Sequence, residues 1–217
     1  MQHIPIYKKL LSYIYPVRIR RSKGDVNPLL DLFVYHGRIQ LATHDAVYSD
    51  GDKYRPLVTA FKELKASMPH VRNVLVLGTG LGSAVNILNK KGWHPQITLI
   101  DNDKVVLQWA MEFLQETEPG KITPICADAK EFIANHHQSY DLLIIDIFSG
   151  RVVPGFATTT GFLQDCRKCI NKEGHVVLNY IENQQPEWIT ARNNFKEVFP
   201  GCKILEIDRN RILIATV

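Results

Sequence analysis

Hydrophobic and polar positions follow two alternating patterns along most of the chain. Short uncharged runs rich in Val, Ile and Leu are typical of buried parallel strands, and the stretches between them carry apolar residues at helical spacing. This alternation predicts repeated strand–helix units, with strands at 74–77, 97–100, 122–126, 142–145 and 176–179. The helices that should follow them lie at 83–90, 104–114, 128–134, 160–170 and 187–198.

The C-terminal end of the chain departs from this repeat. Two strands are predicted at 203–208 and 211–216, and only Arg209 and Asn210 separate them. Such a tight hairpin forces one strand to run against an otherwise parallel sheet. We therefore expect an α/β, Rossmann-like class I methyltransferase fold: a mostly parallel seven-stranded sheet closed by an antiparallel C-terminal hairpin.

The N-terminal pattern predicts a small β-ribbon ahead of this domain. Apolar residues have helical spacing at 6–14, and short strands should follow at 17–21, 29–35 and 38–43. Such a ribbon is too small to bury both of its faces, so it must pack on the main domain or on another subunit. We divide the chain into 1–54 (helix, ribbon and lid segment) and 55–217 (nucleotide-binding domain), and we expect a homodimer or a larger homo-oligomer.

A glycine-rich turn follows the first strand of the main domain. Gly78, Gly80 and Gly82 stand at alternate positions, where they let backbone approach a ligand closely and open a helix whose N–H groups are unpaired. A dinucleotide fingerprint would place Gly or Ala at the position of Ser83. The G-x-G-x-G pattern instead favours an adenosine thioether such as S-adenosylmethionine over NAD.

Three acids each follow an apolar strand directly, where a carboxylate without a partner would be costly. Asp101 should accept hydrogen bonds from ribose hydroxyls, Asp128 from the adenine amino group, and Asp146 should face the reacting carbon and the nucleophile. The alternative is that each acid only caps the helix after its strand. The residues expected to hold the nucleotide are Gly78, Thr79, Gly80, Gly82, Asp101, Asn102, Asp128, Ala129 and Asp146.

The segment 45–54 is polar and turn-forming, yet rich in acids and tyrosines. It leads into a helix predicted over 56–66, with Pro56 well placed in its first turn. The segment serves either as a cap of that helix or as a cap that is also an active-site lid. In the second case Tyr48 or Tyr54 would close over the site and count among the catalytic residues.

Composition excludes several function classes. The net charge of +4 is mild, and its concentration over 18–23 favours a strand edge kept soluble by charge over a nucleic-acid surface. No window reaches the roughly 18 apolar residues of a membrane span, and no signal-peptide core follows the N-terminus. Cys166 and Cys169 have no second pair to complete a metal site. We therefore expect a cytoplasmic protein with no metal, membrane or nucleic-acid partner.

Three motifs carry a family resemblance that runs from about Leu29 to the C-terminus. They are Leu-Ile-Asp101-Asn-Asp103, Ala-Asp128-Ala-Lys-Glu-Phe132 and Tyr-Asp141-Leu-Leu-Ile-Ile-Asp146. In order and content the chain resembles the spermidine synthase family of aminopropyltransferases. The resemblance implies that Asp101 holds the ribose, Asp128 the adenine and Asp146 the attacking amine. Tyr54 best matches the family's active-site tyrosine, and Tyr48 is the competing register.

Two positions depart from that family's pattern, which leaves three hypotheses open. Leu81 and Ser149 stand where the family carries aspartates that grip the cationic amine. We favour an S-adenosylmethionine-dependent methyltransferase on an unidentified small-molecule acceptor, with Asp146 as base. The alternatives are an aminopropyltransferase on decarboxylated S-adenosylmethionine, and a non-catalytic nucleoside-binding or assembly protein. If the protein is an aminopropyltransferase, amine recognition would have to be rebuilt from the tyrosines and from three acids, namely Asp45, Asp50 and Asp52.

Overall fold

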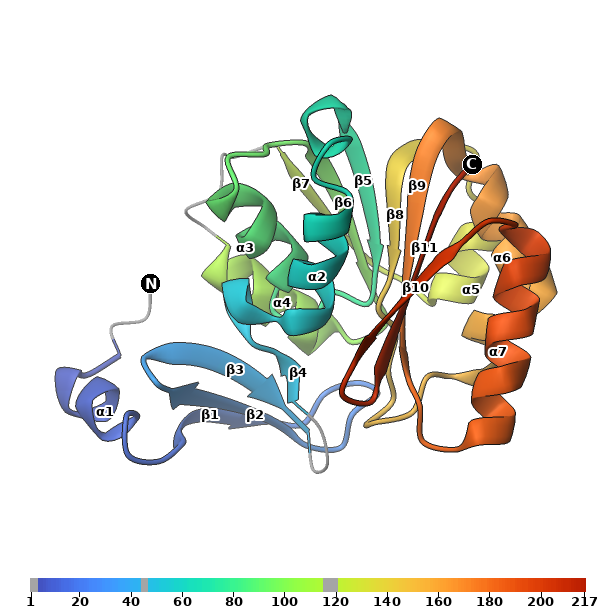
Figure 1. The fold of residues 1–217 in the computed structure, drawn as a ribbon. Coiled ribbons are helices and arrows are strands. Elements are labelled where there is room, and N and C mark those ends of the chain that lie inside the picture. Colours follow the sequence, from blue (N-terminus) through green and yellow to red (C-terminus); the bar gives the residue numbers. More distant parts are fainter. Residues whose placement is uncertain (1–3, 44–46, 115–120) are drawn as a thin grey trace.

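The computed structural model describes residues 4–43, 47–114 and 121–217, which form a seven-stranded and a four-stranded sheet (Figure 1). The larger sheet has the order β10-β11-β9-β8-β5-β6-β7. Its strands from β5 to β9 are mutually parallel, and β11 runs antiparallel to both β9 and β10. The strands are β5 (Asn73–Leu77), β6 (Gln96–Asp101), β7 (Ile122–Cys126), β8 (Tyr140–Ile145), β9 (Ile170–Ile181), β10 (Lys203–Ile207) and β11 (Asn210–Thr216).

The strand order reverses beside β5. The chain proceeds from β5 outward to β6 and β7, then returns to place β8 on the opposite side of β5. In open α/β sheets, ligands bind outside the carboxyl ends of the strands at such a switch point. The predicted fold class, including its antiparallel C-terminal hairpin, is confirmed.

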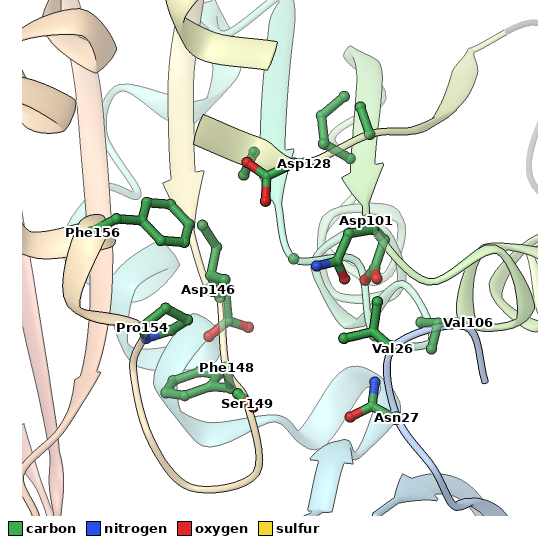
Figure 2. Close-up of a pocket in the computed structure, with 17 residues that line it drawn as sticks. Val26, Asn27, Asp101, Val106, Asp128, Asp146, Phe148, Ser149, Pro154 and Phe156 are labelled. Atoms are coloured by element: carbon green, nitrogen blue, oxygen red, sulfur yellow. The ribbon is translucent and has the colours of Figure 1, made fainter. Parts of the chain in front are cut away.

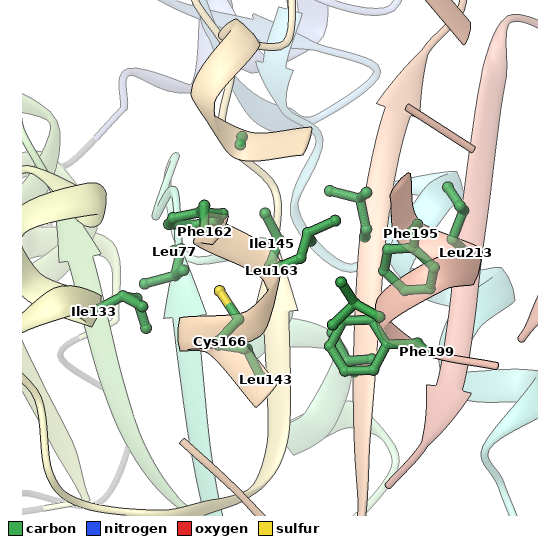
Figure 3. Packing of buried hydrophobic residues seen from close by; sticks show 14 of the residues in the cluster. Leu77, Ile133, Leu143, Ile145, Phe162, Leu163, Cys166, Phe195, Phe199 and Leu213 are labelled. Atoms are coloured by element: carbon green, nitrogen blue, oxygen red, sulfur yellow. The ribbon is translucent and has the colours of Figure 1, made fainter. Parts of the chain in front are cut away.

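Helices cover both faces of the large sheet (Figure 1). One face carries α2 (Arg55–Glu63), α3 (Ser83–Lys90) and α4 (Lys104–Phe113), and the other carries α5 (Ala129–Ala134), α6 (Thr160–Lys168) and α7 (Gln185–Val198). Figure 3 shows the second face, where Leu77, Leu143 and Ile145 of the sheet pack against Phe162 and Cys166 of α6. A sheet that is buried on both faces needs apolar residues at successive positions, which explains the uncharged runs of Val, Ile and Leu in the sequence.

The N-terminal residues form α1 (Ile6–Leu11) and an antiparallel sheet of the order β1-β2-β3-β4. Its strands are β1 (Val17–Ser22), β2 (Leu30–Tyr35), β3 (Arg38–Ala42) and β4 (Val47–Ser49). The sequence predicted three of these strands, and the fourth, β4, lies in the acid- and tyrosine-rich segment. β4 forms because it pairs with β3, and a strand of three residues is too short for its own hydrophobic pattern to predict it.

The small sheet packs on the main domain. Leu30, Leu32 and Leu41 share an apolar cluster with three main-domain residues: Leu81, Val106 and Trp109. This contact is one of the two alternatives expected for the ribbon. The homodimer, and the division of the chain after residue 54, stay predictions.

Shorter elements complete the described chain. They are the 3-10 turns η1 (Gly51–Lys53), η2 (Met68–His70) and η3 (Gly155–Thr158). The main difference from the expected boundaries is β9, which begins at Ile170 rather than 176, because Ile170 pairs with Tyr140 before the register shifts. In the part of the chain that the structure describes, no helix combines the length and apolar character needed to cross a membrane.

Candidate functional site

A pocket opens at the carboxyl ends of β5, β6, β7 and β8, beside the switch point (Figure 2). Asp101, Asp128 and Asp146 all line it, together with the loop that follows β8. The remaining lining comes from the glycine turn and from a loop of the N-terminal region. The lining residues are Val26, Asn27, Gly78, Gly80, Ile100, Asp101, Asn102, Val106, Ala127, Asp128, Ala129, Asp146, Ile147, Phe148, Ser149, Pro154 and Phe156.

Gly78 sets the spacing between the two central strands. Its φ of +90° lies in the region that favours glycine, and a Cβ on it would come within 2.2 Å of the Asp146 carbonyl oxygen. The Asp146 N–H in turn donates to the Leu77 carbonyl at 2.8 Å. Gly78 is therefore needed for the close approach that places Asp146 at the pocket.

Asp101 is bound to the backbone around it. Its carboxylate accepts hydrogen bonds from the Thr79 N–H at 2.9 Å and from the Asp103 N–H at 3.0 Å. Burial raises the pKa of Asp101 to about 6, and these backbone donors offset only part of that effect. Asp101 thus ties the glycine turn to the end of β6 while lining the pocket.

Asp128 caps a helix and also lines the pocket. Its carboxylate accepts hydrogen bonds from the Lys130 and Glu131 N–H groups and caps α5, and the residue also lines the pocket. Both N–H groups donate to Oδ1. Oδ2 could therefore accept a hydrogen bond from a ligand without loss of the helix cap.

Asp103 attaches the N-terminal region to the rim of the pocket. It caps α4 through Oδ1, and its Oδ2 accepts hydrogen bonds from the Val26 and Asn27 N–H groups at 3.3 Å. Val26 and Asn27 line the pocket because of this contact. The sequence does not predict that they line the pocket, since nothing local links residue 26 to residue 103.

Asp146 lies within a group of side chains from three separate parts of the chain. The Asn179 Nδ2 of β9 donates to Asp146 Oδ1 at 2.8 Å, and the Tyr54 hydroxyl donates to the same oxygen at 3.2 Å. Asn179 Nδ2 also lies 3.0 Å from the Tyr54 hydroxyl. The hydrogen bonds found for this carboxylate within the described residues use Oδ1, so Oδ2 remains for a ligand in the pocket.

The electrostatics of this group favour proton transfer at Asp146. Burial raises the pKa of Asp146 to about 6, with Asn179 and Tyr54 acting in the opposite direction. Burial and the neighbouring Asp146 charge raise the pKa of Tyr54 well above its usual value, so Tyr54 stays protonated at neutral pH. A carboxylate with this pKa can accept a proton near neutrality and release it again.

The other predicted site residues have mixed outcomes. Thr79 and Gly82 shape the glycine turn, through a hydrogen bond from the Gly82 N–H to the Thr79 carbonyl, but do not line the pocket. Asn102 and Ala129 do line it. Tyr54 contacts Asp146, whereas Tyr48 is described only as part of the β4 backbone.

The acids expected to rebuild amine recognition have partners away from the pocket. Asp50 accepts hydrogen bonds from Arg38 at 3.2 Å and from Gln40 at 2.8 Å. Asp52 pairs with Lys90 of α3. Asp45 lies outside the described residues. The two described acids therefore hold the N-terminal region together and to α3 rather than line the site.

The two departures from the family pattern differ in their surroundings. Leu81 is 4% exposed and packs in the cluster that joins the small sheet to α4. Ser149 lines the pocket from the loop after β8, where its N–H donates to the Val152 carbonyl at 2.9 Å. Leu81 thus serves packing, and Ser149 leaves a polar but uncharged position beside Asp146.

Asn179 is the main residue that sequence reasoning missed. It is completely buried at the end of an apolar run in β9, in the same sequence context as Asp101 and Asp146. A polar residue directly after a buried strand run is the signal that could have found it. Because its side chain is an uncharged amide, Asn179 is not among the strand-end carboxylates that the sequence pattern marks.

Comparisons with known proteins agree with this geometry. Residues 60–207, more than half of the chain, match the family model described as the spermine/spermidine synthase domain. A polyamine aminopropyltransferase of Clostridium perfringens is 27% identical over 150 residues, which cover 65% of this chain and 53% of that protein. The chain therefore spans about half the length of that relative.

Two further matches cover more of the chain. A polyamine aminopropyltransferase of Alkaliphilus metalliredigens is 24% identical over 221 residues, which cover 94% of this chain and 74% of that protein. The structure of a probable spermidine synthase from Corynebacterium glutamicum superposes with a TM-score of 0.76 at 15% identity, over 91% of this chain and 79% of that one. The latter likeness shows the shared fold.

The methyltransferase hypothesis that we favoured from the sequence is wrong. The family model is described as the spermine/spermidine synthase domain and these two relatives as polyamine aminopropyltransferases, so the comparisons support the alternative instead. The absence of two acids is outweighed by the retained motifs. The family resemblance itself is confirmed, and the chain belongs to the spermine/spermidine synthase family.

Proposed function

We propose that this protein is an aminopropyltransferase that uses decarboxylated S-adenosylmethionine as its donor and a small-molecule amine as its acceptor. The observation that carries the proposal is the position of Asp146 in a chain of this family. Its carboxylate lines the pocket at the switch point, with Oδ1 bound by Tyr54 and Asn179 and Oδ2 left for the amine.

The nucleotide part of the donor fits the other half of the pocket. Asp101 would accept hydrogen bonds from the ribose hydroxyls, and Asp128 from the adenine amino group. The glycine turn brings backbone N–H groups close to the ligand because Gly78 and Gly80 have no side chain. These assignments are supported by the finding that Asp101, Asp128 and Asp146 line the same pocket.

The donor supplies a sulfonium whose propyl carbon is electrophilic. The acceptor nitrogen forms a bond to that carbon with its lone pair, the carbon–sulfur bond breaks, and its electron pair stays on sulfur in methylthioadenosine. An amine acceptor is protonated at neutral pH and has no free lone pair, so it must lose one proton before its nitrogen can attack, and this step needs a nearby base. Asp146 would take this proton and hold the amine in line with the carbon.

Tyr54 and Asn179 would keep this base in place. Both side chains donate to Asp146 Oδ1, which fixes the carboxylate and aims Oδ2 at the pocket. Since Tyr54 stays protonated at neutral pH, it supports the ionised form of Asp146 and does not compete for the proton.

We infer from composition a cytoplasmic protein that acts on small molecules.

Chromatography of the nucleotide product tests the proposal. The protein is incubated with decarboxylated S-adenosylmethionine and either putrescine or spermidine, and we expect methylthioadenosine to accumulate only when an amine is present. Asp146→Asn, which keeps the side-chain shape but removes the base, is the matched control. Binding of methylthioadenosine without any turnover on a panel of amines would contradict the proposed activity.

A further inference from the structure

Two asparagines on neighbouring strands are joined behind the candidate site. In the antiparallel pair of β9 and β11, Asn179 lies opposite Ile212 and Asn210 lies opposite Ile181. The two asparagines are therefore diagonal neighbours on the same face of the sheet. Their side chains meet, since Asn210 Nδ2 donates to Asn179 Oδ1 at 2.8 Å.

This hydrogen bond determines which way the Asn179 amide is turned. An ionised carboxylate can only accept, so Asn179 must present its Nδ2 group to Asp146 Oδ1. Its carbonyl oxygen then points toward β11, where it needs a donor because Asn179 is completely buried. Asn210 supplies that donor, and a residue that only accepts at position 210 would favour the reversed amide.

We propose that Asn210 is a positioning residue that acts through Asn179, holding its amide in the orientation that donates to Asp146 and Tyr54. Asn210 does not line the pocket and has no contact with Asp146 among the described hydrogen bonds. The C-terminal hairpin thereby takes part in the site from its rear. The consequence for catalysis rests on the proposed function, whereas the orientation of the amide does not.

Titratable and charged groups lie on both sides of the asparagine pair. Tyr54 is the titratable group in contact with Asp146, and Asp101 and Asp128 line the same pocket. On the hairpin, Arg211 pairs with Glu182 at 2.6 Å, and its Nε lies 4.0 Å from Glu206. Asp208 pairs with Arg55 in an exposed position. These ion pairs of the hairpin use side chains other than those of Asn179 and Asn210.

Asn210→Asp is the sharpest test. A carboxylate at position 210 can only accept, so it should draw the Asn179 Nδ2 toward itself and turn the Asn179 carbonyl toward Asp146. Asp146 then loses a donor and faces an oxygen, which should raise its pKa by about one unit. Carbon-13 NMR of the aspartate carboxyl groups measures this directly, with Asp146→Asn used to assign the signal.

Kinetics provide the second readout. If the protein transfers aminopropyl groups, the acid limb of the kcat/KM profile in Asn210→Asp should move to higher pH by the same amount. Arg209→Gln is the matched control, because it lowers the net charge of the same hairpin by one and leaves the asparagine pair intact. We expect its profile and its Asp146 signal to stay at the wild-type values.

Two further variants keep the test decisive. Should Asn210→Asp fail to fold, Asn210→Ala removes the donor without adding charge, and it should shift the Asp146 signal in the same direction by less. Asn210→Gln retains the amide donor and should largely restore the wild-type titration. A folded Asn210→Asp or Asn210→Ala protein whose Asp146 titrates as in Arg209→Gln would overturn the proposal, whether or not aminopropyl transfer is detected.

Discussion

The two halves of the pocket hold their carboxylates in different ways. Asp101 and Asp128 are bound by backbone N–H groups. The donors to Asp128 lie in the helix that follows it, whereas Asp101 is bound by Asp103 and by Thr79 of the turn after the neighbouring strand β5. Asp146 is instead bound by the side chains of Tyr54 and Asn179, which lie 92 and 33 residues away in sequence. The carboxylates of the proposed nucleotide half are thus held by backbone groups, whereas the carboxylate of the proposed acceptor half depends on side chains that tertiary packing brings together and can change through those supporting residues.

Removal of the base should have the largest effect. Asp146→Asn keeps the hydrogen-bonding shape of the side chain but cannot accept the proton, so we expect kcat to fall by about 10²- to 10⁴-fold. Methylthioadenosine affinity, measured by calorimetry, should stay near that of the wild type because the nucleotide half is intact. An equal loss of binding and turnover would mean that the halves are not separable.

Restoring the family's acid at position 81 should unfold part of the protein. Leu81 lies among Leu30, Leu32 and Trp109, so a carboxylate there is buried without a partner. We expect Leu81→Asp to cost about 3–5 kcal/mol of unfolding free energy. Urea titration measures it, with Leu81→Met as the volume-matched control. A stable Leu81→Asp protein would show that this position can open toward the pocket.

Stability should depend on pH through the raised pKa of Asp146. An unfolded aspartate ionises near pH 4 and the folded one near 6, so the folded state holds the extra proton in between. Stability is therefore highest below about pH 4 with respect to this group and falls as the pH rises to about 6. Asp146→Asn should abolish a loss of about 3 kcal/mol, and Asp101, whose pKa is also raised to about 6, accounts for a second part.

Thermal unfolding between pH 4 and 8 measures this dependence. The free energies of Asp146→Asn and the wild type should converge at the acid end and separate in favour of the variant at the alkaline end. Parallel curves across the range would contradict the raised pKa.

Loss of the predicted ribose ligand should weaken nucleotide binding. Asp101→Ala should weaken methylthioadenosine binding by about 1.5–3 kcal/mol, since hydrogen bonds to a charged acceptor are lost. The matched control is Asp165→Ala, which removes a carboxylate paired with Lys168 on the surface of α6. Unchanged affinity in a folded Asp101→Ala protein would place the ribose elsewhere.

The smallest expected effect concerns Ser149. This residue is exposed at the pocket, so an acid there is solvated and can meet the distal cation of a diamine. Ser149→Asp should improve putrescine binding by about 1 kcal/mol at most. Steady-state KM values for putrescine and for a monoamine of equal length test this, because only the diamine should respond.

The sequence by itself determined the fold class and predicted the three strand-end acids that line the pocket. Uncharged runs of Val, Ile and Leu mark strands buried on both faces, and the glycine turn and strand-end acids follow those strands within a few residues. Such features depend on neighbours along the chain. For the same reason the motifs around Asp101, Asp128 and Asp146 were sufficient to identify the family.

Only the tertiary structure decided what supports Asp146 and what Leu81 does. Tyr54 and Asn179 reach one carboxylate oxygen from the start of α2 and from β9, Asn210 turns the Asn179 amide from β11, and Asp103 holds the loop at Val26. These contacts join residues far apart in sequence, and no local pattern of hydrophobicity or charge specifies which side chains will meet. Leu81 likewise resembles a lost carboxylate in the sequence, but the structure places it in the packing between the small sheet and α4, where burial of apolar surface favours leucine.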